Sequence, residues 1–436
     1  MSEKTEIPKL IVGKSIEREI QKGTRLIYGT VVKKTKGEPK KGELVWITDE
    51  NGKFLAQGFA NPKSAAVAQI LSLNEKEKID EEFFRGKIFK ANFFRYDKLK
   101  LGTTKLEKPE FNKFAANSPA ITERLNSQYE KKLLDYTATS NAYRLFYGET
   151  DEIPGLLIDR FNNICSMQIS CPGVESWKQK IAEILLEIDG VETVVERNDS
   201  RNRVKLGLPI LKGVLAGGKK TQTVIEEGKV KFEVDALRGH KTGFYLDQRE
   251  NRIAIEQYCP EGSEMLDVFS YTGGFGLHAA VAGAKVTMVD LPEALAQAKR
   301  NAKLNKVEDK IKFMEGDAFE QTQKINSQGK KFDAISCDPP AFIQKPEDLE
   351  KGKKAYHQIN YNCLKLVKDG GILVSSSCSH FLELSDFIDI LIAASANAGK
   401  RASLMEQRFQ ARDHLTPIAS KKGNYLKCIF LRIEDK

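Results

Sequence analysis

The sequence predicts an α/β protein whose carboxyl-terminal half is built on a mostly parallel sheet, and three observations support this. From about residue 221 to the end, short apolar runs alternate with helix-length segments, a pattern typical of a parallel sheet covered on both faces. The first 80 residues hold short β-rich runs separated by turn signals. Residues 81–220, between these two regions, show both strand and helix patterns. We therefore expect three domains, at 1–80, 81–220 and 221–436.

Composition narrows the class of protein. The chain has 436 residues, of which 41% are hydrophobic and 30% charged, which excludes a collagen and a disordered tail. No apolar run reaches the roughly 18–20 residues of a membrane span and the start is polar, so we expect a soluble cytoplasmic protein with no membrane partner. The seven cysteines are scattered, which predicts neither a disulfide framework nor a metal site. A net charge of +9 favours a polyanionic partner such as nucleic acid, although many soluble proteins share it.

The first domain is expected to be small and mostly β. Asn51-Gly52 is a tight hairpin signal. A basic loop with Gly and Pro is expected at 33–42, where phosphates could bind. Its lysines are Lys33, Lys34, Lys36, Lys40 and Lys41. The predicted strands are 26–32, 44–48, 54–59 and 65–73.

The central domain is expected to be α+β. Phenylalanines between 83 and 94 are spaced for one apolar helix face. Residues 143–161 are interpreted as two strands around an acidic turn that contains Pro and Gly. An amphipathic helix follows at 177–186 and a further strand at 193–196.

The third domain is expected to hold five parallel strands with helices between them. The predicted strands are 265–269, 285–289, 311–314, 332–337 and 372–376, and the predicted helices are 274–283, 292–305, 317–328, 353–368 and 384–398. The end differs, because 403–407 and 425–433 face each other with no helix between them. An antiparallel hairpin that closes a parallel sheet fits the S-adenosylmethionine methyltransferases, with their seven-stranded Rossmann-like sheet, better than a dehydrogenase.

A glycine-bearing loop follows the first predicted strand. It runs from Asp267 through Phe269 and Gly273 to Gly276 and opens a helix, so the backbone can approach a ligand closely. Asp290 ends the second strand, where a carboxylate can hold ribose hydroxyls, and Asp317 follows the third. Each aspartate alone could simply cap a helix. Together they favour an adenosyl cofactor, S-adenosylmethionine.

Two reactive residues are predicted at the carboxyl ends of the fourth and fifth strands. Asp338 begins the run Asp-Pro-Pro-Ala-Phe, and Cys378 lies within Ser-Cys-Ser. A thiolate that adds to C6 of cytosine activates C5 toward a methyl sulfonium. Cys337 competes as nucleophile, but it should alternate to the other face of its strand. Ala341 stands where amino-directed DNA methyltransferases place an aromatic, which argues against methylation of an exocyclic amine.

Several motifs together resemble the RlmI-like family of 5-methylcytosine methyltransferases of large-subunit ribosomal RNA. These are GHKTGFYLDQR at 239–249, FSYTGG at 269–274, DPPAF at 338–342 and SCS at 377–379, and the likeness covers nearly the whole chain. It implies a PUA RNA-binding domain first, with Val67 and Gln69 where the family has arginines. It also implies a ribosomal RNA partner, and it leaves room for a homodimer.

The resemblance assigns site residues one by one. It implies that Cys378 is the nucleophile and that Asp338 grips the N3/N4 edge of the cytosine. It implies that S-adenosylmethionine is bound by Lys241, Thr242, Gln248, Phe269, Gly273, Asp290 and Asp317. Two other functions stay open: a guanine-nitrogen methyltransferase that needs no cysteine, and a non-catalytic RNA-binding assembly factor. A nicotinamide dehydrogenase has no use for Asp-Pro-Pro or the final hairpin.

Overall fold

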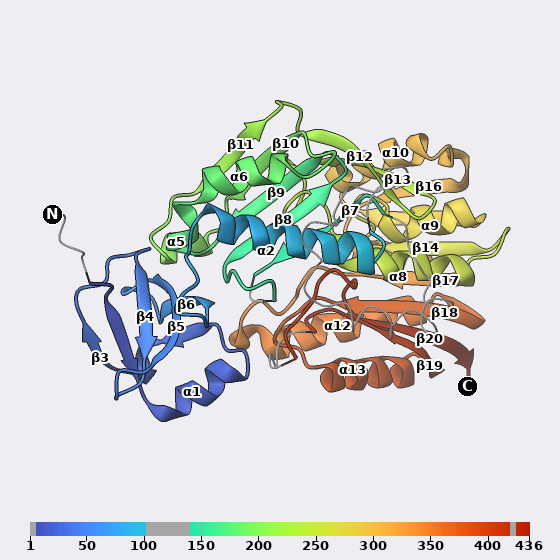
Figure 1. The fold of residues 1–436 in the computed structure, drawn as a ribbon. Coiled ribbons are helices and arrows are strands. Elements are labelled where there is room, and N and C mark those ends of the chain that lie inside the picture. Colours follow the sequence, from blue (N-terminus) through green and yellow to red (C-terminus); the bar gives the residue numbers. More distant parts are fainter. Residues whose placement is uncertain (1–5, 102–139, 149, 419–423) are drawn as a thin grey trace, which may run out of the picture. The chain divides into compact units, whose positions relative to one another are not determined.

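The computed structural model describes residues 6–101, 140–148, 150–418 and 424–436 (Figure 1). The chain forms two compact units. The first comprises residues 1–225, 234–244 and 415–419, and the second comprises 226–233, 245–414 and 420–436. Among the described residues, no helix combines the length and the apolar character needed to cross a membrane.

The amino-terminal part of the first unit is a six-stranded sheet of order β2-β6-β5-β4-β1-β3. Its elements are β1 (Lys9–Val12), α1 (Lys14–Gln21), β2 (Leu26–Tyr28), β3 (Val32–Lys36), β4 (Leu44–Thr48), β5 (Phe54–Ala60) and β6 (Ala66–Ser72). The predicted loop at 33–42 is partly wrong, because its first residues form edge strand β3, paired antiparallel with β1. The five lysines of this segment are all exposed.

The rest of the first unit is a mixed α/β layer around a five-stranded sheet of order β11-β10-β9-β8-β7. Its elements are α2 (Glu81–Phe93), β7 (Ala142–Tyr147), β8 (Leu156–Phe161), β9 (Ile164–Ile169), α5 (Pro172–Glu175), α6 (Lys178–Leu186), β10 (Thr193–Asn198), α7 (Asn202–Lys205) and β11 (Leu211–Gly217). Two further strands, β12 (Gln222–Glu227) and β13 (Val230–Asp235), pair with each other.

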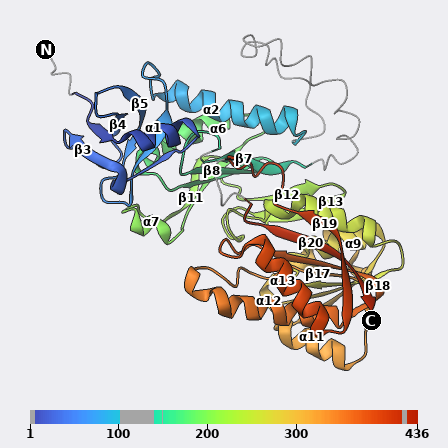
Figure 2. The same cartoon turned by 90° about the horizontal axis from the view of Figure 1, so that it is seen from below.

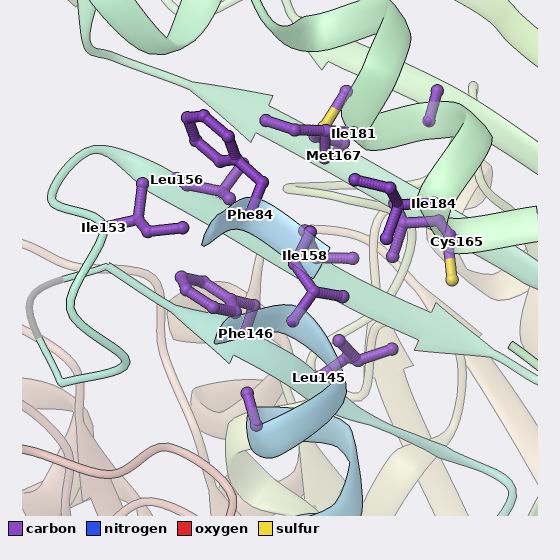
Figure 3. Close-up of a cluster of buried hydrophobic side chains, with 14 of the residues drawn as sticks. Phe84, Leu145, Phe146, Ile153, Leu156, Ile158, Cys165, Met167, Ile181 and Ile184 are labelled. Atoms are coloured by element: carbon purple, nitrogen blue, oxygen red, sulfur yellow. The ribbon is translucent and has the colours of Figure 1, made fainter. Parts of the chain in front are cut away.

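The core of this layer forms where α2 and α6 pack on the sheet. Asp80 starts α2, because its carboxylate accepts a hydrogen bond from Phe83 N at 3.1 Å. Figure 3 shows Phe84 of α2 with Phe146 and Ile158 from the strands, and Ile181 from α6. The apolar helix face predicted from the phenylalanine spacing is confirmed for Phe83 and Phe84, whereas Phe94 lies beyond the end of α2 and is exposed.

The second unit holds a seven-stranded sheet of order β16-β15-β14-β17-β18-β20-β19. Its strands are β14 (Glu264–Val268), β15 (Lys285–Asp290), β16 (Ile311–Glu315), β17 (Phe332–Cys337), β18 (Val367–Ser377), β19 (Lys400–Arg408) and β20 (Lys427–Asp435). The first five are parallel, and β20 runs antiparallel to both β18 and β19. The predicted α/β class and its closing hairpin are confirmed.

Helices cover this sheet, and the strand order fixes where a ligand can approach. The helices are α8 (Arg249–Ala254), α9 (Gly274–Ala282), α10 (Pro292–Leu304), α11 (Ala318–Ser327), α12 (Leu349–Leu364) and α13 (Leu384–Asn397). Helices α12 and α13 lie side by side in Figures 1 and 2, and their apolar residues share a core with the strands. The order reverses between β14 and β17, so a crevice is expected at the carboxyl ends of these strands.

Candidate active site

The loop after β14 turns sharply through a strained backbone. Phe269, Tyr271 and Gly273 have φ of 62°, 49° and 89°. Positive φ is uncommon outside glycine and clusters at ligand sites. Gly276 lies where α9 packs closely on the sheet, because a Cβ at this position would lie only 2.6 Å from Met288 Cε. Gly273 thus serves a left-handed turn and Gly276 the close packing of α9 on the sheet, while close approach of this backbone to a ligand stays a prediction.

Two carboxylates hold this loop in place. Asp267 accepts a hydrogen bond from Gly276 N at 2.8 Å and another from the Ser336 hydroxyl, which ties α9 to β14 and β17. Burial raises the pKa of Asp267 to about 6. Asp290 accepts from Tyr271 N and Leu291 N, both at 2.7 Å. These two bonds leave lone pairs of the Asp290 carboxylate for ribose hydroxyls.

Asp317 has a clear structural role. It is the N-cap of α11, and its Oδ1 accepts from Phe319 N at 2.9 Å and from Glu320 N at 3.1 Å. Helix capping, the simple explanation for this residue, therefore holds for one carboxylate oxygen. The side chain is exposed, so the same carboxylate can still meet a ligand.

An aromatic wall stands beside the loop. The ring centroid of Phe269 lies 6.4 Å from those of both Phe319 and Phe342, and these two are 6.1 Å apart. All three rings are partly exposed. Such a wall suits the flat apolar face of an adenine. Close by in sequence, Ser270 Oγ is buried and has no hydrogen-bond partner among the described residues. A buried hydroxyl without a partner, in the same loop as Phe269, fits a ligand that carries polar groups.

The remaining predicted cofactor residues fall in both units. Gln248, in the second unit, is buried, and its Oε1 accepts from Asn251 Nδ2 at 2.7 Å. Lys241 and Thr242 belong to the first unit. Thr242 is buried there and donates to Asp159 Oδ2 at 2.5 Å, and Asp159 also pairs with Arg144 at 2.8 Å. Thr242 thus has a structural role in its own unit, while Lys241 is exposed.

Asp338 follows β17 at the predicted crevice. Its backbone N donates to Val268 O at 3.3 Å, so it lies next to the end of β14. Burial raises the pKa of Asp338 to about 7, and the carboxylates of Asp247 and Asp267 add to this effect. The nearby Gln248 amide and the Arg252 guanidinium favour the charged carboxylate and so partly offset this increase in pKa. A carboxyl group with this pKa exchanges its proton near neutrality.

Cys378 follows β18, the parallel neighbour of β17, so Cys378 and Asp338 lie at the same edge of the sheet, where the two strands end. Cys378 is partly exposed, whereas the other six cysteines are buried. Its turn is fixed by Ser379, whose hydroxyl bonds to Ile343 N at 3.1 Å and to Tyr356 Oη at 2.9 Å. Cys337 is fully buried, as predicted for the opposite face, and a hydrogen bond with Cys363 and burial hold its pKa well above the ordinary range.

Tyr245 joins the two halves of the site, and the sequence did not single it out. Its ring meets that of Tyr271 edge to face at 5.3 Å. Burial raises its pKa, with further contributions from Tyr271, Cys378, Asp247 and Asp338. The loop after β14, Asp338 and Cys378 therefore all interact electrostatically with this one phenol. Only its place in the 239–249 motif could have suggested a role, because no pattern distinguishes it from a core tyrosine.

Comparisons with known proteins agree with this geometry. A PUA-like domain model matches residues 10–73, and an S-adenosylmethionine-dependent methyltransferase model matches residues 213–399. The chain superposes on a solved structure provisionally named a methyltransferase and complexed with SAH, with a TM-score of 0.74. That match is 18% identical and covers 97% of this chain and 99% of the other, so it supports the fold. The protein is an S-adenosylmethionine-dependent methyltransferase with an amino-terminal PUA-like domain.

Two curated relatives define the family. Ribosomal RNA large subunit methyltransferase I of Pseudoalteromonas translucida is 35% identical over 413 residues, or 93% of this chain and 94% of the relative. A protein of Methanocaldococcus jannaschii, provisionally named a ribosomal RNA large subunit methyltransferase, is 39% identical over 396 residues and 90% of each chain. The chain belongs to the ribosomal RNA large subunit methyltransferase I family.

Asp290→Ala is expected to weaken S-adenosylmethionine binding roughly 10–150-fold, the value of a lost charge-assisted hydrogen bond of about 1.5–3 kcal/mol. Calorimetric titration of the purified protein measures this affinity. Asp290→Asn, which keeps one acceptor and the shape of the side chain, should lose less. If affinity holds in the alanine variant while the melting temperature collapses, Asp290 serves only to fasten the loop at Tyr271.

Proposed function

We propose that the protein transfers a methyl group from S-adenosylmethionine to C5 of a cytosine in large-subunit ribosomal RNA, through a covalent adduct between Cys378 and C6. The observation that carries the proposal is the partly exposed Cys378 at the same sheet edge as Asp338. A buried thiol would be inert, and six of the seven cysteines are buried. The names of the family relatives supply the RNA class.

We propose that S-adenosylmethionine is held by the loop from Phe269 to Gly273, with Asp290 on the ribose and Asp317 near the base. The aromatic wall would pack on the adenine, and the buried Ser270 hydroxyl would gain a partner. Gln248, Lys241 and Thr242 are further cofactor residues implied by the family motif. The bound cofactor supplies an electrophilic methyl group on a sulfonium.

The reaction starts at Cys378. Its thiolate adds to C6, and the electrons of the C5–C6 double bond move to C5. C5 then attacks the methyl group, breaks the bond between that methyl and the sulfonium sulfur, and releases S-adenosylhomocysteine. A base removes the C5 proton, the double bond reforms, and the bond between Sγ and C6 breaks to return the thiolate. The addition creates negative charge in the ring, which must be stabilised on the N3 side.

Asp338 is suited to that stabilisation when it is protonated. A carboxylic acid donates one hydrogen bond and accepts others, so Asp338 can donate to N3 and accept from the N4 amine. A pKa of about 7 keeps a large fraction of this acid protonated at neutral pH. Asp338 must be protonated, which low pH favours, and Cys378 must be ionised, which high pH favours. We therefore expect a bell-shaped dependence of the methylation rate on pH.

Deletion of the gene provides the direct test of the function. Ribosomal RNA from the deletion strain should lack one 5-methylcytosine, which bisulfite sequencing locates. Wild-type protein should restore the mark and Cys378→Ala should not. Loss of a methylated guanine, restored by both proteins, would instead identify the guanine-nitrogen alternative.

The lysines of 33–41 are proposed to contact RNA phosphates. Neutralising Lys33, Lys34, Lys36, Lys40 and Lys41 together should weaken RNA affinity and flatten its salt dependence, because each phosphate contact adds about 0.7–0.9 to the log–log slope. Filter binding across a salt series measures this slope. The control neutralises five exposed lysines of the second unit, Lys285, Lys303, Lys306, Lys312 and Lys324. An unchanged slope in the first variant would mean that this segment is only a solvated surface.

A further inference from the structure

A buried lysine, Lys427, touches the chain on both sides of Cys378. It is the first residue of β20, and its backbone lies opposite Ser377 in the antiparallel register. Its side chain continues to the other side of the turn, where Nζ donates to Ser379 O at 2.7 Å and to Tyr425 O at 2.9 Å. Lys427 is only 3% exposed.

A lysine is rarely buried without a reason, because removing an ammonium from water is costly. Two backbone carbonyls accept two of its three N–H donors, and neither carries a formal charge. Burial lowers the pKa of Lys427 to about 8, while the nearby Cys378 thiol and the Glu383 carboxylate favour the ammonium form. Most of the population is still charged at pH 7.

Besides the Glu383 carboxylate, and Asp338 at the same sheet edge, the described titratable groups around the thiol include two phenols and an imidazole. Tyr245 and Tyr356 both interact with Cys378, and burial raises both of their pKa values, that of Tyr356 to about 12. They stay neutral near pH 7. His380, two residues after the cysteine, stacks on the Tyr425 ring with centroids 5.1 Å apart. Lys427 therefore supplies a cation to this group of side chains at neutral pH.

We propose that Lys427 is a positioning residue for the nucleophile, whose ammonium stabilises the Cys378 thiolate and whose bond to Ser379 O keeps the turn at the sheet edge. This inference rests on the proposed cysteine-adduct reaction. The thiol proton leaves to solvent before addition, and the thiolate released from C6 returns to the same ammonium. Lys427 itself neither gains nor loses a proton during turnover.

The test is the pH dependence of alkylation of Cys378 by iodoacetamide in the full-length protein without RNA, followed by mass spectrometry of the peptide. Lys427→Gln, which keeps a donor but removes the charge, should raise the pH midpoint by about one unit or more, a roughly tenfold loss of thiolate below the midpoint. Lys427→Arg should stay near wild type. His380→Gln tests the other source of positive charge and should leave the midpoint in place.

Lys400→Gln is the matched control. Lys400 is also a buried lysine of this sheet, with Nζ donating to Val367 O at 3.2 Å and paired with Asp435. Asp435 is at the far end of β20 from Lys427, about 26 Å along a strand that rises about 3.3 Å per residue. The midpoint for Cys378 should not move in this variant.

An unchanged midpoint in folded Lys427→Gln overturns the proposal, as does a midpoint that moves equally in Lys400→Gln. If Lys427→Gln fails to fold, the reciprocal measurement decides. Cys378→Ala should lower the pKa of the Lys427 ammonium, followed by NMR of lysines labelled at Cε, and no change overturns the proposal. Neither measurement uses RNA, so failure of cytosine methylation would leave a shifted midpoint as a separate result.

Discussion

RNA carrying 5-fluorocytosine at the target position is expected to trap the protein covalently, and Cys378→Ala is expected to abolish both trapping and methylation. Fluorine cannot leave as a cation, so elimination stalls after methyl transfer and the bond between Sγ and C6 persists. The adduct should require S-adenosylmethionine. Denaturing gel electrophoresis with labelled RNA measures it, and loss of the nucleophile should reduce turnover by about 10³-fold or more.

Cys337→Ala provides the control for this experiment. Cys337 is the neighbouring candidate, but it is buried and its thiol is held neutral beside Cys363, so trapping should survive its removal. An adduct that depends on Cys337 would move the nucleophile to that residue. Absence of an adduct on a substrate that the wild type methylates would refute the cytosine-C5 mechanism and favour guanine-nitrogen methylation.

Asp338→Asn is expected to lower turnover by about 10²–10⁴-fold, since an amide donates to N3 poorly and cannot exchange a proton. Affinity for S-adenosylmethionine should change little. The falling limb of the pH–rate profile, expected near pH 7 in the wild type, should disappear. Asp333→Asn is the matched control, because Asp333 lies near the opposite end of β17 and bonds with Lys368 at 2.9 Å. A normal pH profile in Asp338→Asn would contradict this role.

The same substitution should stabilise the protein above neutral pH. The pKa of Asp338 is raised on folding, so between about pH 4 and pH 7 the native state binds more protons than the unfolded state. Stability from this group is therefore present at low pH and falls as the pH rises through 7. Removing the charge should raise the free energy of unfolding at pH 8 by about 1–2 kcal/mol, discounted for partial exposure. Thermal melts at pH 5 and pH 8 measure the difference.

The order of strands and helices in the methyltransferase sheet could be predicted, because its strands are buried apolar runs separated by amphipathic helices. The bounds were less exact, since β18 already begins at Val367, within the helix predicted at 353–368. The strand predicted at 332–337 matches β17 as observed. The prediction of a loop at 33–42 was partly wrong, because the strand there has no run of buried apolar residues. Strand β3 is an edge strand whose exposed side chains are mostly lysines, so it has no apolar signal, and its pairing with β1 alone makes it a strand.

The site could be predicted only where the residue type already limits the chemistry. Asp338 and Cys378 follow predicted strands, so their meeting at one sheet edge could be inferred from topology. Asp317 shows the limit of that reasoning, since its cap on α11 and any ligand contact have the same sequence pattern. Lys427 has no signal of its own in the sequence. Burial of a lysine depends on which strand covers it, and no local pattern records that.

The seven cysteines differ in burial, and we therefore expect them to differ in their sensitivity to oxidation. Burial raises the pKa of Cys165, Cys259 and Cys428 to about 12, so these thiols resist peroxide, which attacks the thiolate. Cys378 is partly exposed, and any feature that favours its thiolate for catalysis favours sulfenic acid formation as well. With Cys378 as the proposed nucleophile, its oxidation to sulfenic acid would stop methylation, and a small thiol reductant would restore it.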